Sequence, residues 1–206
     1  MTDIKKFTSF ATSNCYLVRP FNNEIVFLID LPPNIDDVID YINTNNLTIG
    51  GAFITHGHWD HAIGLSSFDS KAYINLDDEH LARNPNEQIG DFLGDKVSVN
   101  KYEGNLHNVL DHDYDFLHVY INPGHTKGSV SFEFKDLGVV FTGDFIFKDS
   151  IGRTDLYSGD NNEMIDSINN VFTLFNDDFQ LFPGHGDGDT VINIKKNNQL
   201  IREYLK

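Results

Sequence analysis

Apolar and polar positions near the start of the chain follow the spacing of two strands, then a helix, then a strand. The runs "NCYLVRP" and "EIVFLID" predict strands joined by a polar turn at Asn22 and Asn23. Asn34 is placed to cap the helix, whose apolar face follows the i, i+3, i+4, i+7 spacing: Ile35, Val38, Ile39 and Ile42. The run "GGAFIT" then predicts a short buried strand that ends beside His56.

The middle of the chain carries weaker patterns. "KAYINL" indicates a further strand, and the acidic "DDEHLARN" indicates a short helix. From about Asn84 to Asp115 the sequence is polar and is interrupted by Gly90, Gly94 and Gly104. We therefore expect irregular structure in this segment.

The second half repeats the strand and helix patterns. "FLHVYI", "SVSFEF", "LGVVFTG" and "FQLF" predict strands. "NNEMIDSINNVFTLF" predicts a helix with an apolar face, and a closing helix carries a second one; these faces are Met164, Ile165, Ile168, Phe172 and Phe175, then Val191, Ile194, Ile201 and Leu205. Because no Pro-, Gly- or Ser-rich linker separates the halves, residues 1–206 are expected to form a single α/β domain of two sheets with helices outside them.

Composition narrows the class of partner. Hydrophobic residues make up 40% of 206 residues, which is enough for a sizeable core. With 15 Lys and Arg against 31 Asp and Glu, the formal charge of −16 disfavours nucleic acid and anionic membranes as partners. One cysteine, Cys15, excludes an intramolecular disulfide, and no signal peptide or membrane-spanning run is visible. A cytoplasmic protein that acts on a small molecule is the expectation.

Candidate ligands of a metal ion follow four of the predicted strands. "THGHWDH" places His56, His58, Asp60 and His61 after "GGAFIT". The motifs "NPGHTKGS", "FTGD" and "FPGHG" place further candidates at later strand ends: His125, Asp144 and His185. Functional side chains collect at such ends because the loops there converge on one point. The remaining histidines are interpreted as ordinary strand or surface residues: His80, His107, His112 and His118.

Imidazole and carboxylate side chains without a thiolate suit zinc, iron or manganese. Five histidines and two aspartates can hold two such ions if one aspartate bridges them. His56 and His58 cannot share one face of a helix, but in an extended turn both can reach one ion. Asp60 and His61 then begin the next helix and can face a second ion.

The ordered set "THGHWDH", "PGHTKGS", "FTGD" and "PGHG" resembles the metallo-β-lactamase superfamily. "NCYLV" and "GDFIFKDSIGRTDLYSGD" are similar to its short glyoxalase II-like, or hydroxyacylglutathione hydrolase-like, branch. The resemblance implies an αββα sandwich of two mixed sheets, with His56, His58 and His125 on the first metal. It gives Asp60, His61 and His185 to the second metal and makes Asp144 the bridge.

The resemblance also implies thioester hydrolysis by a metal-bound hydroxide, with two divalent ions, most simply zinc, as cofactors. The catalytic residue is Asp60, which orients the hydroxide. An acyl thioester, S-acylglutathione or a related small compound, is the expected substrate. About 20 residues follow His185, fewer than the glutathione-holding region of full-length glyoxalase II enzymes, so weak dependence on glutathione is expected.

Other functional classes stay open beside the thioester hydrolase. A mononuclear iron persulfide dioxygenase resembles the same branch and carries a similar "GRTD" segment. A non-catalytic domain conflicts with a full ligand set, because so many unpaired imidazoles would have no structural purpose. A β-lactamase is less expected, because that activity is usually exported and no signal peptide is visible. A nuclease is also less expected, because it needs additional nucleic-acid-binding regions for which this short acidic chain has no room.

A few residues outside the ligand set have expected roles. Asp30 is expected to support the ligands, although "LPP" follows it where the family usually has "PG". Lys127, Arg153 and Tyr157 lie in loops where they could contact substrate, and Arg153 could equally pair with a nearby aspartate. Cys15 is not expected to be a nucleophile.

Overall fold

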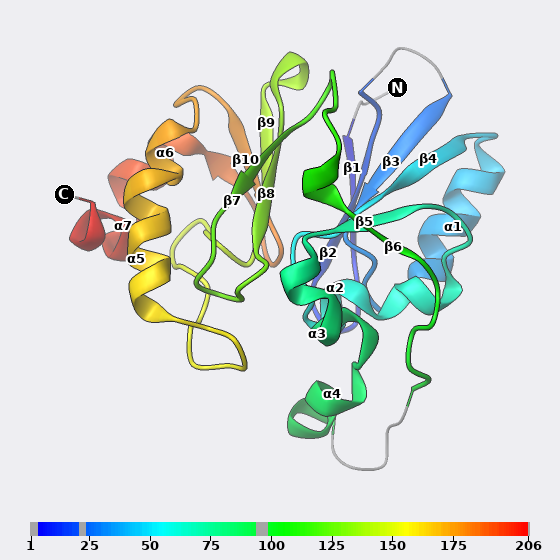
Figure 1. Ribbon diagram of the computed structural model, residues 1–206. Coiled ribbons are helices and arrows are strands. Elements are labelled where there is room, and N and C mark those ends of the chain that lie inside the picture. The colour runs from blue at the N-terminus through cyan, green and yellow to red at the C-terminus, as the bar shows by residue number, and fades with distance from the viewer. Residues whose placement is uncertain (1–3, 21–23, 94–98, 206) are drawn as a thin grey trace. The chain divides into compact units, whose positions relative to one another are not determined.

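The computed structural model describes residues 4–20, 24–93 and 99–205. The chain forms two compact units, Met1–Asp111 and His112–Lys206, each built on one mixed sheet with helices (Figure 1). The predicted turn at Asn22 and Asn23, and Gly94, lie outside the described residues. Two mixed sheets flanked by helices confirm the predicted α/β class.

The first unit contains a six-stranded sheet in the order β1-β2-β3-β4-β5-β6. Its first three strands are antiparallel neighbours, whereas β3 to β6 are parallel. The strands are β1 Ile4–Thr8, β2 Asn14–Val18, β3 Ile25–Ile29, β4 Thr48–Phe53, β5 Ala72–Ile74 and β6 Leu106–Asn108, and the helices are α1 Ile35–Thr44, α2 Trp59–Ala62, α3 Glu79–Arg83 and α4 Asn86–Leu93. Single turns of 3₁₀ helix lie at Ile63–Ser67, Leu76–Asp78 and Val109–Asp111.

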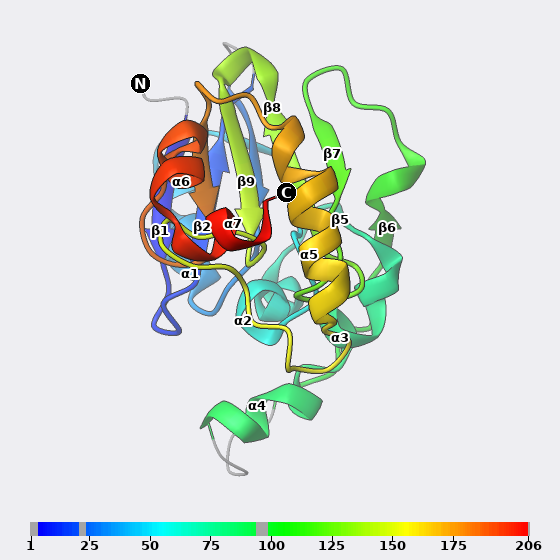
Figure 2. The ribbon, with the colours of Figure 1, turned by 90° about the vertical axis from the view of Figure 1, so that its left-hand side faces the viewer.

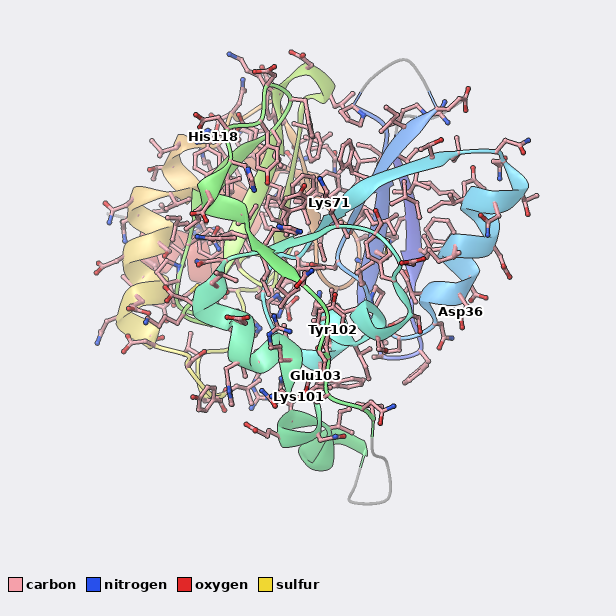
Figure 3. The ribbon with its side chains drawn as sticks, turned by 45° about the vertical axis from the view of Figure 1, so that its right-hand side comes forward. Asp36, Lys71, Lys101, Tyr102, Glu103 and His118 are labelled. Carbon is pink, nitrogen blue, oxygen red and sulfur yellow. The ribbon has the colours of Figure 1, made fainter. Side chains whose placement is uncertain are left out.

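Helix α1 covers one face of this sheet. Its buried positions Ile35, Val38 and Ile42 share a core with Leu28 of β3, while Asp36 faces outward (Figure 3). Asn34 occupies the predicted position before the helix, in a left-handed conformation, but its side chain makes no capping hydrogen bond. The predicted capping interaction is therefore wrong. The apolar spacing alone located the helix.

The segment from Asn84 to Asp115 is more regular than predicted. It contains α4 and β6, because Pro85 starts a helical turn whose carbonyl accepts from Gln88 N and Ile89 N. Ile89 is fully buried. Ile89, Phe92 and Leu93 follow the i, i+3, i+4 spacing of a helix over this one short stretch, but the polar residues and glycines around it favoured irregular structure.

The second unit contains a five-stranded sheet in the order β11-β10-β9-β8-β7, with only β9 and β10 parallel. The strands are β7 His118–Ile121, β8 Val130–Phe134, β9 Val139–Gly143, β10 Gln180–Pro183 and β11 Asp189–Thr190. The helices are α5 Asn161–Asn170, α6 Val191–Asn197 and α7 Gln199–Tyr204, with 3₁₀ turns at Lys135–Leu137 and Phe172–Leu174.

Helices α5, α6 and α7 lie together on one face of this sheet (Figure 2). The long helix predicted over "NNEMIDSINNVFTLF" ends as α5 at Asn170, and Phe172 and Phe175 join the same core beyond it. The single predicted closing helix is two helices, because Asn198 is extended. Its side-chain amide donates to the carbonyls of Phe147 and Ser150, and its side-chain oxygen accepts from Ile201 N.

Each sheet carries aromatic rings on the face opposite its helices. In the first unit, Phe27 and Phe53 alternate with residues that pack under α1, and Phe53 stacks on Tyr73 at 5.3 Å between ring centroids. In the second unit, Phe141 stacks on Phe182 at 5.3 Å. Within the described residues, no helix is both long and apolar enough to span a membrane.

Candidate metal centre

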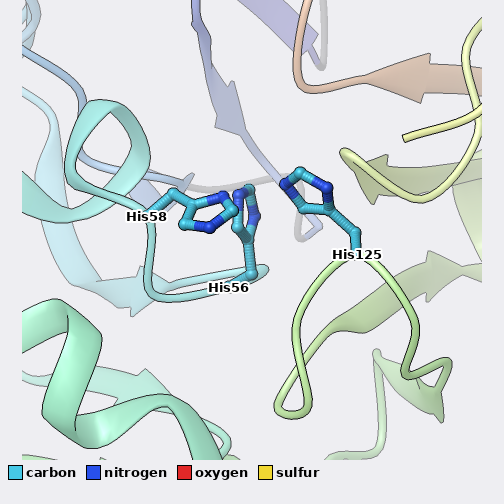
Figure 4. A group of neighbouring side chains, drawn as sticks. All are labelled: His56, His58 and His125. Carbon is cyan, nitrogen blue, oxygen red and sulfur yellow. The ribbon is translucent and has the colours of Figure 1, made fainter. Parts of the chain in front are cut away.

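In the first unit, the loop after β4 carries the first group of predicted ligands. His56 and His58 stand on this loop with ring centroids 4.9 Å apart and ring planes nearly perpendicular (Figure 4). His61 follows in α2 with its ring centroid 4.3 Å from that of His56. All three imidazoles are buried, and the side chain of Asp60 is 17% exposed.

Asp30, at the end of β3, fixes the proton positions on two of these histidines. Its carboxylate accepts from Thr55 N at 2.7 Å and from the Thr55 hydroxyl at 2.9 Å. Because the only proton of that hydroxyl is already donated to Asp30, the hydroxyl oxygen accepts a hydrogen bond from His56 Nδ1 at 3.0 Å. The Nε2 atom of His56 therefore keeps the lone pair that a metal ion needs.

His61 is oriented by the same carboxylate. Its Nδ1 lies 2.8 Å from Asp30 Oδ2, which can only accept, so the Nδ1 atom carries the proton. Its Nε2 lies 3.7 Å from Asp60 Oδ2. Asp30 is almost fully buried and adopts a left-handed backbone with a φ of 62°, which aspartate tolerates better than most residues. Asp30 thus contacts His61 directly and His56 through Thr55, which are the contacts that its expected supporting role requires.

In the second unit, three predicted ligands come from the loops after β7, β9 and β10. Asp144 Oδ2 lies 3.6 Å from His125 Nε2 and 3.6 Å from His185 Nε2. One carboxylate oxygen is thus equally near two imidazole nitrogens. His125 Nδ1 donates to the backbone carbonyl of Arg153 at 2.7 Å, which leaves its Nε2 unprotonated.

The segment from Phe145 to Arg153 returns the chain to these ligands. Gly152 N donates to the carbonyl of Phe145, and Gly152 packs directly against Asp144 and His125. A Cβ atom there would lie 1.8 Å from the Asp144 carbonyl oxygen and 3.2 Å from His125 Cγ. Only glycine permits this approach, which gives a physical reason for the glycine in the "SIGRTD" segment.

The donor set in each unit fits a transition-metal ion. Two ligand atoms at about 2.1 Å from one tetrahedral ion lie about 3.4 Å apart. The Nε2-to-carboxylate distances of 3.6 and 3.7 Å are close to that value and longer than a hydrogen bond. The Nδ1 atoms of three histidines are already committed to protein acceptors, which is the usual arrangement around metal-bound imidazole.

The remaining residues singled out from the sequence have the following surroundings. Each of the four histidines interpreted as ordinary contacts one nearby side chain. The pairs are His80 with Glu87, His107 with Tyr73, His112 with Tyr114 and His118 with Tyr120. Arg153 donates two hydrogen bonds of 2.7 and 2.8 Å to the carboxylate of Asp155. These hydrogen bonds lower the pKa of Asp155 to about 2. The Tyr157 ring is 70% exposed.

Sequence reasoning missed the residues that hold the ligand loop. Thr55 connects Asp30 to His56 through hydrogen bonds. Asp78, at the end of the 3₁₀ turn before α3, and Gln88, in α4, accept hydrogen bonds from backbone N–H groups of the loop. Gly152 and the Arg153 carbonyl support His125. Hydrogen bonds to distant backbone atoms leave no local pattern, so no sequence signal separates Asp78 from Asp77.

The chain belongs to the metallo-β-lactamase superfamily, whose family model matches residues 9–185. The resemblance inferred from the ligand motifs is therefore confirmed. A relative from Haemophilus influenzae, named hydroxyacylglutathione hydrolase GloC, is 29% identical, with 91% of this chain and 92% of that protein covered. A probable metallo-hydrolase from Streptococcus pyogenes is 28% identical, with 94% and 88% covered.

A solved structure supports the fold. The protein TTHA1623, crystallised in a di-iron-bound form, has a TM-score of 0.84 with 23% identity, covering 95% of this chain and 99% of that one.

Proposed function

We propose that this chain is a metal-dependent hydrolase of small acyl thioesters that uses two divalent metal ions. His56, His58 and His125 hold the first ion, Asp60, His61 and His185 hold the second, and Asp144 bridges them. The observation that carries this assignment is the position of Asp144 Oδ2, 3.6 Å from both His125 Nε2 and His185 Nε2. This position between two imidazoles would suit a carboxylate shared by two ions.

Two bound ions would supply the reactive water and the electrophile, since a bound dication lowers the pKa of water to about 7 and polarises a carbonyl. The protein supplies orientation. The carboxylate of Asp60 is partly exposed, so it can accept a hydrogen bond from the attacking water and hold it in line with the thioester carbonyl. The thiolate that leaves is a stable anion near neutral pH, so no dedicated general acid is needed.

An open groove beside His185 offers room for one end of the substrate. It has a volume of about 530 Å³ and is bordered by two loops, 147–150 and 185–187. Asn198, which is fully buried, fixes the first loop by donating to the carbonyls of Phe147 and Ser150. The ring of Phe147 provides an apolar wall, and small acyl groups suit a wall of this kind.

We also propose that the two units act as one domain, residues 1–206. Each sheet is covered by helices on one face and carries aromatic rings on the other, and a row of such rings needs an apolar partner. Expression of either unit alone should give an aggregating or poorly folded product. A monomeric, cooperatively unfolding fragment would contradict the single domain.

The finer identity of the substrate and cofactors belongs to the same proposal. The relative named hydroxyacylglutathione hydrolase supports an acyl thioester, with glutathione as one candidate thiol. We propose zinc for both ions, and the same imidazole and carboxylate ligands also suit iron or manganese. We place the protein in the cytoplasm, without nucleic acid or membrane partners, in keeping with its formal charge of −16.

Steady-state hydrolysis tests the proposal directly. One acyl group is presented as its glutathione thioester and as its N-acetylcysteamine thioester to protein loaded with zinc, iron or manganese. Cleavage of at least one thioester by wild type, lost in Asp144→Ala, is expected. No cleavage of either, with oxygen consumption on a glutathione persulfide by a single-iron form, would replace the hydrolase with a persulfide dioxygenase.

A further inference from the structure

The two hydrogen-bond donors that flank His58 along the backbone are both satisfied by one distant segment. Gly57 N donates to Asp78 Oδ2 at 2.8 Å, and Trp59 N donates to Gln88 Oε1 at 3.0 Å. These are the peptide N–H groups immediately before and after His58. Asp78 closes the 3₁₀ turn before α3, and Gln88 lies in α4.

The backbone around His58 needs acceptors from elsewhere in the chain because His58 stands at the start of a helix. Helix α2 begins at Trp59, and the first N–H groups of a helix have no partner inside the helix. Ser, Thr, Asp or Asn at the preceding position usually caps the second or third of them with its own side chain, so the first, Trp59 N, needs an acceptor from elsewhere. Here that position is His58, which makes no capping hydrogen bond, because an imidazole that serves a metal ion cannot also fold back on its helix.

The contacts are built into the packing of the segment. Asp78 is fully buried, and Gly57 lies so close that a Cβ atom would come 2.6 Å from the Asp78 carbonyl oxygen and 2.7 Å from Leu81 Cβ. Gln88 is held in turn, because its amide nitrogen donates to the carbonyl of Leu81 at 2.9 Å. The amide thus links α4, α3 and the start of α2.

We infer that Asp78 and Gln88 are positioning residues for the metal ligand His58, which they hold through the peptide N–H groups on either side of it. This inference rests on the proposed function, since it takes His58 as a ligand. Loss of either acceptor leaves an N–H group without its protein partner next to a buried loop. The loop then moves to satisfy that group, and His58 loses its alignment.

Metal affinity is the direct readout, and Gln88→Met is the central variant because it keeps the length of the side chain and removes both polar atoms. We expect zinc or cobalt affinity, measured by competition with a chromophoric chelator, to fall by about 10- to 100-fold. Gln88→Glu should recover part of this loss, because a carboxylate oxygen accepts the same N–H group but cannot donate to the carbonyl of Leu81. Glu87→Ala, on the same helix but hydrogen-bonded to His80, is the matched control and should keep wild-type affinity.

A double-mutant cycle separates positioning from general stability. In a His58→Ala background, Gln88→Met should no longer reduce the remaining metal affinity, because the ligand that it positions is gone. Trp59 is the only tryptophan of the chain, so its fluorescence reports on this turn in every variant. Asp78→Asn, which keeps an acceptor oxygen, is a second and independent variant and should stay near wild type.

Two results would overturn the inference: wild-type metal affinity in Gln88→Met, or the same fold loss with and without His58. A wild-type chain that binds metal but cleaves no thioester would remove the substrate proposal and leave this role of Gln88 standing. A wild-type chain that binds no metal would overturn both.

Discussion

Replacing Gly152 by alanine should lower the metal content of the protein without unfolding the second unit, because Gly152 packs against Asp144 and His125. The new Cβ atom would lie 1.8 Å from the carbonyl oxygen of Asp144, whereas nonbonded carbon and oxygen atoms pack at about 3.4 Å. One of the two backbone segments must therefore move by about 1.5 Å. Because His125 Cγ lies 3.2 Å from the same Cβ position, the imidazole is displaced as well.

These contacts set the size of the expected losses in stability and in kcat. Overpacking of a fully packed site costs about 1–3 kcal/mol, and each kcal/mol lowers Tm by about 2–4 °C in a chain of this size. A fall in Tm of roughly 2–12 °C is expected in the metal-free protein. A displacement of about 1 Å can reduce catalysis about 10²-fold, so kcat should fall by at least that factor.

The assay pairs thermal unfolding with elemental analysis of the purified protein. Gly138→Ala is the matched control, because its φ of 66° also disfavours alanine but its Cβ would meet nothing closer than Phe179 at 3.8 Å. The control should lose about 1 kcal/mol of stability and keep its metal. Full metal content and normal kcat in Gly152→Ala would refute the reasoning that this glycine shapes the ligand loop.

Three further predictions concern the ligands and the cysteine. Asp60→Asn should lower kcat about 10²-fold with metal content matched to wild type, and a change below about threefold would exclude Asp60 as the group that orients water. Cys15→Ser should keep kcat within a few-fold of wild type, because Cys15 is fully buried and burial, aided by Asp30, raises the pKa of its thiol well above the usual value; a trapped acyl-cysteine would contradict this. Thr55→Val should weaken metal binding about 10-fold in a chelator competition, because it removes the hydroxyl that fixes the proton on His56 Nδ1, whereas Thr55→Ser should bind normally.

Most of the strands could be predicted because they are short apolar runs bounded by turn residues. Strand β1, "IKKFT", was not among the predictions, since its two lysines interrupt the apolar pattern. Helix α4 was not expected because its apolar residues Ile89, Phe92 and Leu93 form one short cluster in a polar segment interrupted by glycines. The break at Asn198 depends on hydrogen bonds to Phe147 and Ser150, about fifty positions earlier, which no local pattern reveals.

The proposed ligands were visible in the sequence because each of their motifs follows an apolar strand. The residues that orient them were not, apart from Asp30. Gly57 and Asp78 are 21 positions apart, and Trp59 and Gln88 are 29 apart. Such contacts depend on how helices α3 and α4 pack against the loop. That packing is a property of tertiary structure rather than of any motif.

The central claim is that seven histidine and aspartate side chains hold two metal ions with Asp144 as the bridge, and metal content per chain tests it most directly. Elemental analysis of wild type, after saturation with zinc and removal of free metal, should give two ions per chain. Asp144→Ala should lower the occupancy of both positions, because its Oδ2 lies 3.6 Å from a histidine of each proposed site. One ion in wild type, or two ions in Asp144→Ala, would contradict the claim.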